Sequence, residues 1–102
     1  MWVRVTSIRV SSGKADEMRK IYNEEIVPVA KQQKGNKGIY LLEPAGGQGE
    51  FLSCTAWETK EDADAYSGKY SGLVDKVRHC LTGEPTLKEY ELKQQSATAA
   101  HS

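Results

Sequence analysis

The chain has 102 residues, of which 38% are hydrophobic and 27% charged, a composition typical of one globular domain and not of a disordered or fibrous protein. Its 14 basic and 14 acidic side chains cancel and no basic block is present, so nucleic acid is not an expected partner. No apolar run is long enough to span a membrane or to form a signal-peptide core, which favours a cytoplasmic protein without membrane association.

The first half of the chain predicts a strand and a bent helix. Residues 2–10 are rich in β-branched side chains with charges at intervals, which is typical of a strand. From residue 14 to residue 33, apolar residues recur every three or four positions, as on one side of an amphipathic helix. Pro28 has no amide N–H and its ring crowds the preceding turn, so a bend is expected near residues 24–27. Gly35 is the expected end of this helix.

The middle of the chain predicts two strands and a second helix. Residues 37–43 and 50–58 have strand character and are joined by a loop rich in proline and glycine. Thr59 is the expected N-cap of the helix that follows. Ser-Gly pairs at 67–68 and 71–72 predict that this helix breaks into a short piece and a longer one.

The end of the chain predicts one more strand and a tail. The longer helical piece is expected over residues 73–82, and residues 86–93 have the pattern of a fourth strand. Residues 94–102 are small and polar without periodicity, and a disordered tail is expected there. The two cysteines, Cys54 and Cys80, form no CxxC pair and are expected to be free thiols.

The order strand, helix, strand, strand, helix, strand predicts an α+β fold of the ferredoxin-like βαββαβ type over residues 1–93. In this fold a four-stranded antiparallel sheet carries both helices on one face. Phe51 and Trp57 lie on one side of the third strand and Leu52 and Ala56 on the other, so both faces of the sheet carry apolar groups. A bare apolar face usually marks an interface, and a homodimer packed sheet against sheet is expected.

Three stretches together resemble the antibiotic biosynthesis monooxygenase (ABM) domain family of dimeric α/β-barrel proteins. They are IVPVAKQQKGNKGIYLLE at 26–43, AWETKEDADAY at 56–66 and GEPTLKEYEL at 83–92. The resemblance implies a dimeric α/β barrel with a ligand cavity between sheet and helices. The family includes cofactor-independent oxygenases of aromatic polyketides and quinols, haem-degrading enzymes, and members without an assigned activity.

Within this resemblance, Trp57 matches a tryptophan at the strand end that recurs in the family. Haem-degrading members carry a second Trp where this chain has Tyr66, the haem-ligating His where it has Lys76, and an Asn where it has Ser7. Because all three positions differ, haem degradation is not the favoured function. Arg78 lies near the position of a substrate-binding Arg in an oxygenase of the family.

His79 is the single histidine of the predicted folded part, because His101 lies in the tail. It could act as a base near neutral pH, or replace the family's haem ligand from one helical turn away. It could equally be a surface residue at a helix C-terminus, where the helix dipole favours it. No further ligand stands at a zinc-like spacing from it, so neither a metal nor another cofactor is expected.

Aromatic and basic residues complete the predicted site. Trp57, Tyr22, Tyr66 and Tyr70 could line a pocket for a flat ligand, and packing in the core explains them equally well. Arg4 lies on the face of the first strand that carries apolar neighbours. It could pair with a carboxylate, Glu89 or Glu91, or bind an anionic substrate.

The leading hypothesis is a homodimeric cofactor-independent monooxygenase that acts on a small quinol-like or phenol-like molecule. The expected catalytic residues are His79, Arg78 and Tyr66, and the expected substrate-binding residues are Trp57, Tyr22, Tyr70 and Ser7. The alternative is a non-catalytic dimeric protein that binds a small hydrophobic molecule, and a haem-binding protein is a third possibility. The fold alone does not decide among them.

Overall fold

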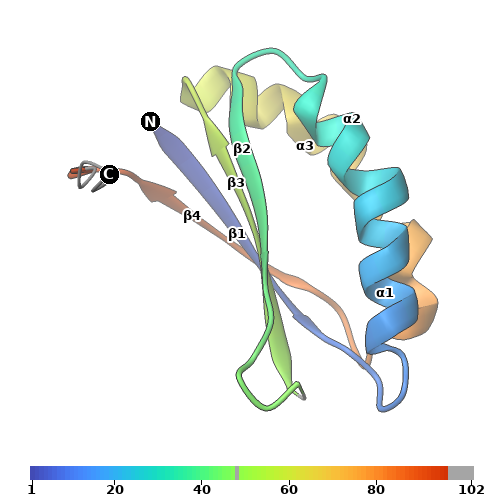
Figure 1. Ribbon diagram of the computed structural model, residues 1–102. Helices are drawn as coiled ribbons and strands as arrows, with labels where there is room; N and C mark the ends of the chain where they lie inside the picture. The colour runs from blue at the N-terminus through green and yellow to red at the C-terminus, as the bar shows by residue number, and fades with distance from the viewer. Residues whose placement is uncertain (48, 97–102) are drawn as a thin grey trace, which may run out of the picture.

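A four-stranded antiparallel sheet with helices on one face forms this molecule (Figure 1). The structure is a computed structural model that describes residues 1–47 and 49–96. The strands are β1 (Trp2–Arg9), β2 (Asn36–Leu42), β3 (Glu50–Trp57) and β4 (Thr86–Glu91). They lie in the order β2-β3-β1-β4, and all neighbours are antiparallel. The predicted ferredoxin-like βαββαβ fold is confirmed.

The first helical segment is bent where the sequence predicts it. Its parts are α1 (Ala15–Ile21), the π-helical turn η1 (Tyr22–Ile26) and α2 (Val27–Lys31). The amide of Val27 donates a hydrogen bond to the carbonyl of Tyr22, five residues back, instead of four. Pro28 explains this widened turn, because it offers no amide hydrogen to the carbonyl four residues back and its ring needs space there. The bend is confirmed.

The predicted break in the second helix is wrong. Helix α3 (Lys60–Val77) runs through both Ser-Gly pairs and is followed by the 3₁₀ turn η2 (Arg78–Cys80). Gly68 and Gly72 lie on its exposed side, while its opposite side is buried. Packing of that apolar side therefore outweighs the low helix propensity of the two glycines. The predicted N-cap is confirmed, since Thr59 Oγ1 accepts a hydrogen bond from the Asp62 amide at 3.1 Å.

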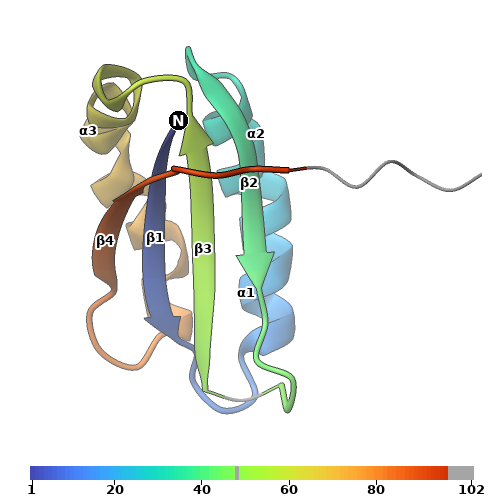
Figure 2. The same cartoon turned by 90° about the vertical axis from the view of Figure 1, so that its left-hand side faces the viewer.

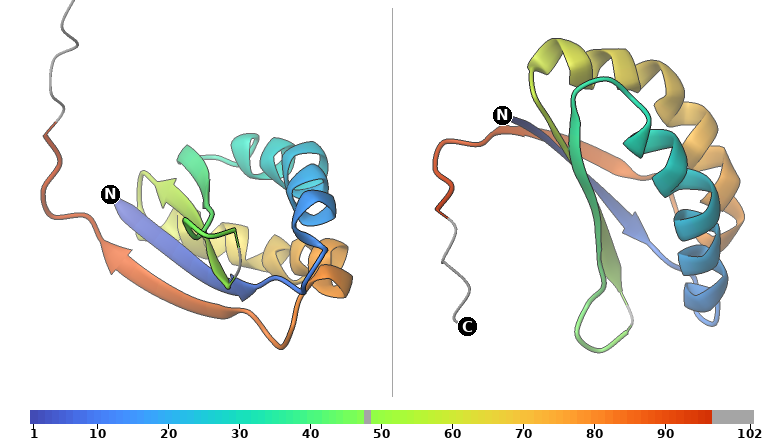
Figure 3. Two further views of the ribbon diagram at one scale, coloured as in Figure 1. Left: turned by 60° about the horizontal axis from the view of Figure 1, so that its bottom comes forward. Right: turned by 45° about the horizontal axis from the view of Figure 1, so that its top comes forward.

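The two faces of the sheet differ in what covers them. The bent first segment and α3 lie side by side over one face (Figure 3). Under them lies a core with fully buried side chains: Met18, Phe51, Trp57 and Cys80. No helix covers the opposite face in the described part of the chain, and residues that follow β4 cross in front of it (Figure 2).

The uncovered face is apolar, as the alternation in β3 predicts. Tyr40 and Leu42 of β2 and Tyr90 of β4 lie on it and are each about half exposed. Between them run the odd-numbered residues of β1, which pair with Leu52, Cys54 and Ala56 of β3. This surface is the bare apolar face that the sequence predicts.

Three smaller predictions concern the C-terminal tail, the thiols and membrane-spanning helices. Residues 94–96 have no regular structure and are exposed, whereas residues 97–102 of the predicted tail lie outside the described residues. Both cysteines are free, as expected. Among the described residues, no helix has the length and hydropathy that crossing a membrane requires.

The continuity of α3 can be tested by substitution at its glycines. We expect Gly68→Ala and Gly72→Ala each to raise the free energy of unfolding by about 0.5–1 kcal/mol, because alanine restricts the unfolded chain. A Cβ at either position meets open space. Urea denaturation monitored by circular dichroism measures the change.

Gly35→Ala is the contrasting control. Gly35 has a φ of +80° and a Cβ there would overlap the Asp62 carboxylate, so this variant should be destabilised. Loss of stability in Gly68→Ala and Gly72→Ala as well would indicate that α3 needs a flexible break.

Candidate active site

A small cavity lies between the sheet and the two helices that cover it. Its volume is about 50 Å³, and it is bounded by η1, α3 and the covered face of β1 and β3. Its polar lining residues are Arg4, Thr6, Tyr22, Ser53, Thr55, Tyr66 and Tyr70. Its apolar lining residues are Ile8, Ile26, Leu73, Val74 and Val77. This volume admits a few water molecules and is well below the roughly 150 Å³ of an apolar cavity that holds benzene. An aromatic ligand therefore requires the cavity to enlarge.

Arg4 supplies the positive charge of this cavity. Its side chain is only 4% exposed, and its Nη1 donates a hydrogen bond to Ser67 Oγ at 2.6 Å. The same nitrogen lies 3.4 Å from Glu89 Oε1, and the guanidinium carbon lies 5.5 Å from the centre of the Tyr70 ring. The predicted pairing of Arg4 with Glu89 is thus observed. It joins β1 to β4, while Ser67 and Tyr70 join β1 to α3.

The remaining donors of Arg4 are available to a ligand. Within the described part of the chain, its side-chain hydrogen bonds all start from Nη1, and Nε and Nη2 donate none. No fully buried side-chain nitrogen or oxygen there lacks a partner, so Nε and Nη2 must keep contact with accessible space. Arg4 lines the cavity, so a ligand there can approach these two nitrogens. A guanidinium in this position can bind an oxyanion through two parallel hydrogen bonds.

Two tyrosine hydroxyls face the cavity in their protonated form. Tyr22 forms a 2.7 Å hydrogen bond with Ser53 Oγ, and burial raises its pKa to about 12. Burial also raises the pKa of Tyr66 to about 12, although the nearby charge of Arg4 acts in the opposite direction. Both phenols therefore keep their protons near neutral pH. The Tyr66 hydroxyl can donate a hydrogen bond to a ligand, whereas the Tyr22 hydroxyl donates to the Tyr40 carbonyl oxygen at 3.4 Å. Neither phenol is a base there.

Trp57 packs against Tyr66, one of the residues that line the cavity. It is fully buried and does not line the cavity, and its indole N–H donates to Thr55 Oγ1 at 2.9 Å. Its ring centroid lies 4.8 Å from that of Tyr66, and the planes are tilted by 35°. Trp57 thus fixes the orientation of Tyr66. Of the residues predicted to bind substrate, Tyr22 and Tyr70 line the cavity directly, as does the predicted catalytic Tyr66.

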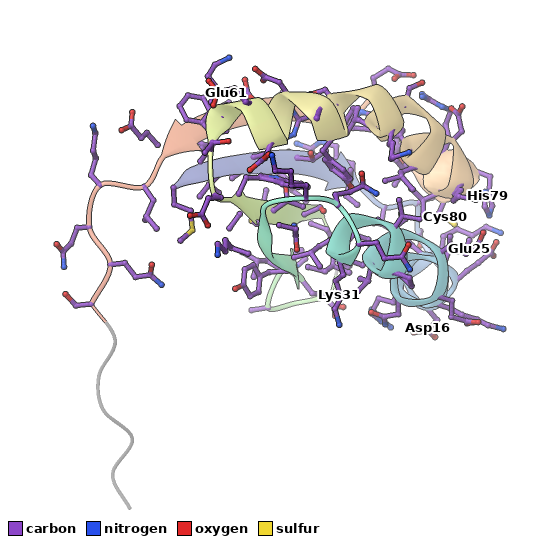
Figure 4. The ribbon with its side chains drawn as sticks, turned by 90° about the horizontal axis from the view of Figure 1, so that it is seen from above. Asp16, Glu25, Lys31, Glu61, His79 and Cys80 are labelled. Carbon is purple, nitrogen blue, oxygen red and sulfur yellow. The ribbon has the colours of Figure 1, made fainter. Side chains whose placement is uncertain are left out.

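Two predicted catalytic residues lie outside the cavity. His79 and Arg78 belong to η2, beyond the end of α3, and both are exposed. His79 Nε2 lies 2.6 Å from Glu17 Oε2 (His79 is labelled in Figure 4). Arg78 forms ion pairs with Asp75 and Glu84. Neither side chain is among those that line the cavity, so the geometry does not bring them together with the tyrosines.

Ser7 faces away from the cavity. Successive residues of a strand point to opposite faces, and its neighbour Thr6, which pairs with Ser53, is the residue that lines the cavity. The assignment of Ser7 to the site is therefore displaced by one residue. Lys76 is exposed and contacts Glu25 at 3.3 Å, away from the cavity.

The sequence predicts Arg4 as the partner of a carboxylate or of an anionic substrate, and it does not predict Thr6 or Ser53 as site residues. The signal for Arg4 was present, because a charged residue stands among apolar ones on one strand face. Thr6 and Ser53 carry no such signal, since small hydroxyl residues are common in exposed strands as well. Their position becomes meaningful only once the register of β1 and β3 is known.

A family model and a search of curated sequences show what this chain is similar to. A family model described as antibiotic biosynthesis monooxygenase matches residues 1–70, which is more than half of the chain. The chain belongs to this family. Curated protein sequences give no match.

Many solved structures share the fold of this family member. A candidate antibiotic biosynthesis monooxygenase from Deinococcus radiodurans has a TM-score of 0.79 at 16% identity, covering 98% of this chain and 100% of that one. Another from Nitrosomonas europaea has a TM-score of 0.75 at 19% identity, covering 89% and 97%. The haem-degrader MhuD from Mycobacterium tuberculosis, solved with two haems in its active site, has a TM-score of 0.76 at 22% identity, covering 95% and 100%. At these identities the likeness shows the fold.

The cavity residues of this family member do not fit a haem iron. Histidine, cysteine and methionine, the usual neutral or thiolate axial ligands, are absent from the described lining. Tyrosinate is a known axial ligand, but burial raises the pKa values of Tyr22 and Tyr66 to about 12 and disfavours the phenolate. The cavity is also smaller than one benzene-sized ring requires.

The buried tyrosines make stability depend on alkaline pH. Their folded-state pKa values lie above the ordinary value of about 10, so the unfolded chain releases these protons first as pH rises. The free energy of unfolding should therefore fall between about pH 10 and about pH 12, by about 1 kcal/mol per tyrosine at about pH 11.

Urea denaturation of the wild type, Tyr22→Phe and Tyr66→Phe at about pH 9 and about pH 11 measures this effect. Each Phe variant should lose less stability than the wild type between the two pH values. Tyr40→Phe is the control, because Tyr40 is 55% exposed. Equal losses in all four proteins would refute the burial of these hydroxyls.

Proposed function

We propose that this protein is a cofactor-independent monooxygenase that oxidises a small phenol-like or quinol-like molecule. The observation that carries the proposal is Arg4, a buried guanidinium with free donors in a cavity otherwise lined by aromatic, aliphatic and hydroxyl side chains. Substrates that react with dioxygen directly must first become electron-rich anions. A cationic group in an enclosed apolar cavity stabilises such an anion more strongly than water-exposed charge does.

The chemistry demands little of the protein. The substrate phenol or enol loses a proton to solvent and its anion is held by Nε and Nη2 of Arg4. The anion supplies the electrons that reduce dioxygen, a carbon–oxygen bond forms, and the peroxide loses water. For a methylene group activated by neighbouring rings, the balance is CH₂ + O₂ → C=O + H₂O. Tyr66 donates a hydrogen bond to a substrate oxygen, Tyr22 lines the cavity beside Ser53, and Tyr70 stacks at the edge of the cavity.

The cavity must open before an aromatic substrate enters. The polar groups that hold α3 against β1 are the Arg4–Ser67 hydrogen bond and the contact of Arg4 with Tyr70. A ligand larger than the cavity has to lengthen one of these contacts, and Ser67 keeps a partner if it leaves Arg4, because its hydroxyl also donates to the Ala63 carbonyl at 3.4 Å. Substrate binding is therefore expected to displace α3 or the Tyr70 ring.

We also propose that the working unit is a homodimer. Three aromatic or aliphatic side chains that are each about half exposed, Tyr40, Leu42 and Tyr90, gather on the uncovered sheet face. Two such faces packed together would remove them from water, as in a sandwich of two sheets. The two free cysteines support a reducing compartment such as the cytoplasm as its location.

A non-catalytic role in binding small molecules is the second candidate. It is favoured by one observation: the described cavity lining includes no carboxylate or imidazole that could act as a base. A binding protein needs none. Thermal stabilisation by phenolic ligands without oxygen consumption would select this candidate over the enzyme.

Oxygen uptake in the presence of quinols and anthrone-like phenols tests the enzyme. We expect Arg4→Met to lower kcat/KM at least about 100-fold, because the anion loses its charge partner. Lys69→Met, on the exposed side of α3, is the control and should keep full activity. Circular dichroism and thermal unfolding verify that both variants fold.

Two further variants separate the cavity from the residues predicted by sequence. If His79 or Arg78 takes part in the reaction, His79→Ala or Arg78→Met will lose activity as strongly as Arg4→Met. Retained activity in both, together with loss in Arg4→Met, supports the cavity. Unchanged turnover in Arg4→Met contradicts the assignment of Arg4.

The dimer is tested by placing a charge on the uncovered sheet face. Leu42→Asp should convert the dimer to a monomer in sedimentation velocity, because its carboxylate would be buried without a partner. Ala65→Asp, on the exposed side of α3, is the control and should leave the dimer intact. A wild-type chain that sediments as a monomer at micromolar concentration would disprove the dimer.

A further inference from the structure

We propose that Glu17, His79 and Cys80 form a binding site for a divalent transition metal ion, with Zn²⁺ as the best match. One ligand atom from each residue, a carboxylate oxygen, a ring nitrogen and a sulfur, lies within 4.8 Å of the other two. The three atoms come from α1 and η2, which are remote in sequence. None of the three residues lines the aromatic cavity, so this site is separate from the proposed active site.

The spacing of these atoms is close to what a zinc ion requires. Zinc bonds of about 2.0–2.3 Å arranged as a tetrahedron place neighbouring ligand atoms about 3.3–3.6 Å apart. The Glu17 Oε2–His79 Nε2 distance of 2.6 Å is shorter, as expected when a proton joins the two atoms in place of a metal. No pair exceeds 4.8 Å, so Glu17 and His79 have to move toward the sulfur by about 1.5 Å at most. Glu17 and His79 are exposed and can adjust.

Cys80 is the ligand of this site that the fold holds in place. Its side chain is fully buried, and its carbonyl accepts a 2.8 Å hydrogen bond from the Ser11 amide, which anchors η2 to the loop before α1. Glu17 and His79 form the outer rim and leave a fourth position open to solvent or a ligand. Figure 4 shows His79 and Cys80 together at one end of the helical layer, far from Glu61 near the start of α3.

The donor set selects the metal. A thiolate favours zinc and other thiophilic ions over magnesium and calcium, and imidazole with carboxylate completes a common zinc set. The ion would displace the thiol proton of Cys80 and any proton shared by Glu17 and His79. Lys14 lies 3.6 Å from Glu17 Oε1 and opposes a cation, but it is half exposed and can turn away.

Titration of the tag-free 102-residue chain with Zn²⁺ tests the site. Isothermal calorimetry should give one ion per chain, and His79→Gln and Cys80→Ser should each weaken binding at least about tenfold. Titration with Co²⁺ should give a sulfur-to-cobalt charge-transfer band that Cys80→Ser removes. Because Cys80 is buried, the surface variants His79→Gln and Glu17→Gln keep the test decisive if Cys80→Ser fails to fold.

Substitutions of a cysteine, a histidine and a glutamate outside the proposed metal site serve as matched controls. Cys54→Ser, His101→Gln and Glu25→Gln should leave the affinity unchanged. Absence of Zn²⁺ binding, equal affinity in His79→Gln and the wild type, or loss of binding in Cys54→Ser or His101→Gln would each overturn the proposal.

Discussion

The covered side of this fold depends on the buried charge of Arg4, whose guanidinium lies between the sheet and the helices. Removing a charge from water costs several kcal/mol, which is recovered only if partners satisfy it. Arg4 obtains those partners from two other elements, Glu89 of β4 and Ser67 and Tyr70 of α3. Stability alone does not explain the arrangement, because apolar residues of similar volume are often as stable as a buried ion pair. A residue that is costly to bury and keeps unpaired donors is better explained by a ligand.

One strand serves both surfaces of the protein. Even-numbered residues of β1, such as Arg4 and Thr6, face the cavity, and odd-numbered ones, such as Val3 and Val5, face the uncovered side. Successive side chains of a strand point to opposite faces. An alignment that is displaced by a single residue therefore assigns a site residue to the opposite face. Ser7 is such a case.

The sequence predicts the fold well because the local signals agree with one another. Alternation marks the strands, the proline marks the bend that becomes η1, and Thr59 marks the start of α3. The prediction fails where packing opposes local propensity, as at Gly68 and Gly72, whose helix is held by its buried side. Such a balance depends on tertiary contacts that a single sequence does not reveal.

The candidate site is less predictable, because it depends on directions and distant pairings. Aromatic residues are typical of pockets, and this predicts Tyr22, Tyr66 and Tyr70. His79 is predicted by its residue type and Arg78 by the family resemblance, and neither argument shows where η2 points. The proximity of Glu17 to His79, 62 positions apart, is invisible to any rule based on local spacing. Only the packing of η2 against α1 reveals it.

Tyr66 shows what a substrate must do to ionise in this cavity. It is a phenol beside Arg4, yet burial outweighs the attraction of the guanidinium and its pKa rises to about 12. Nearness to the charge is therefore insufficient. Tyr66 makes no hydrogen bond to Arg4, whereas a substrate oxygen placed on Nε and Nη2 would gain two charge-assisted bonds, and direct contact with an arginine lowers an acid's pKa by about 1–3 units. In the proposed reaction, the phenols that ionise would be those whose oxygen reaches the guanidinium while their rings lie among Tyr70, Leu73 and Val74.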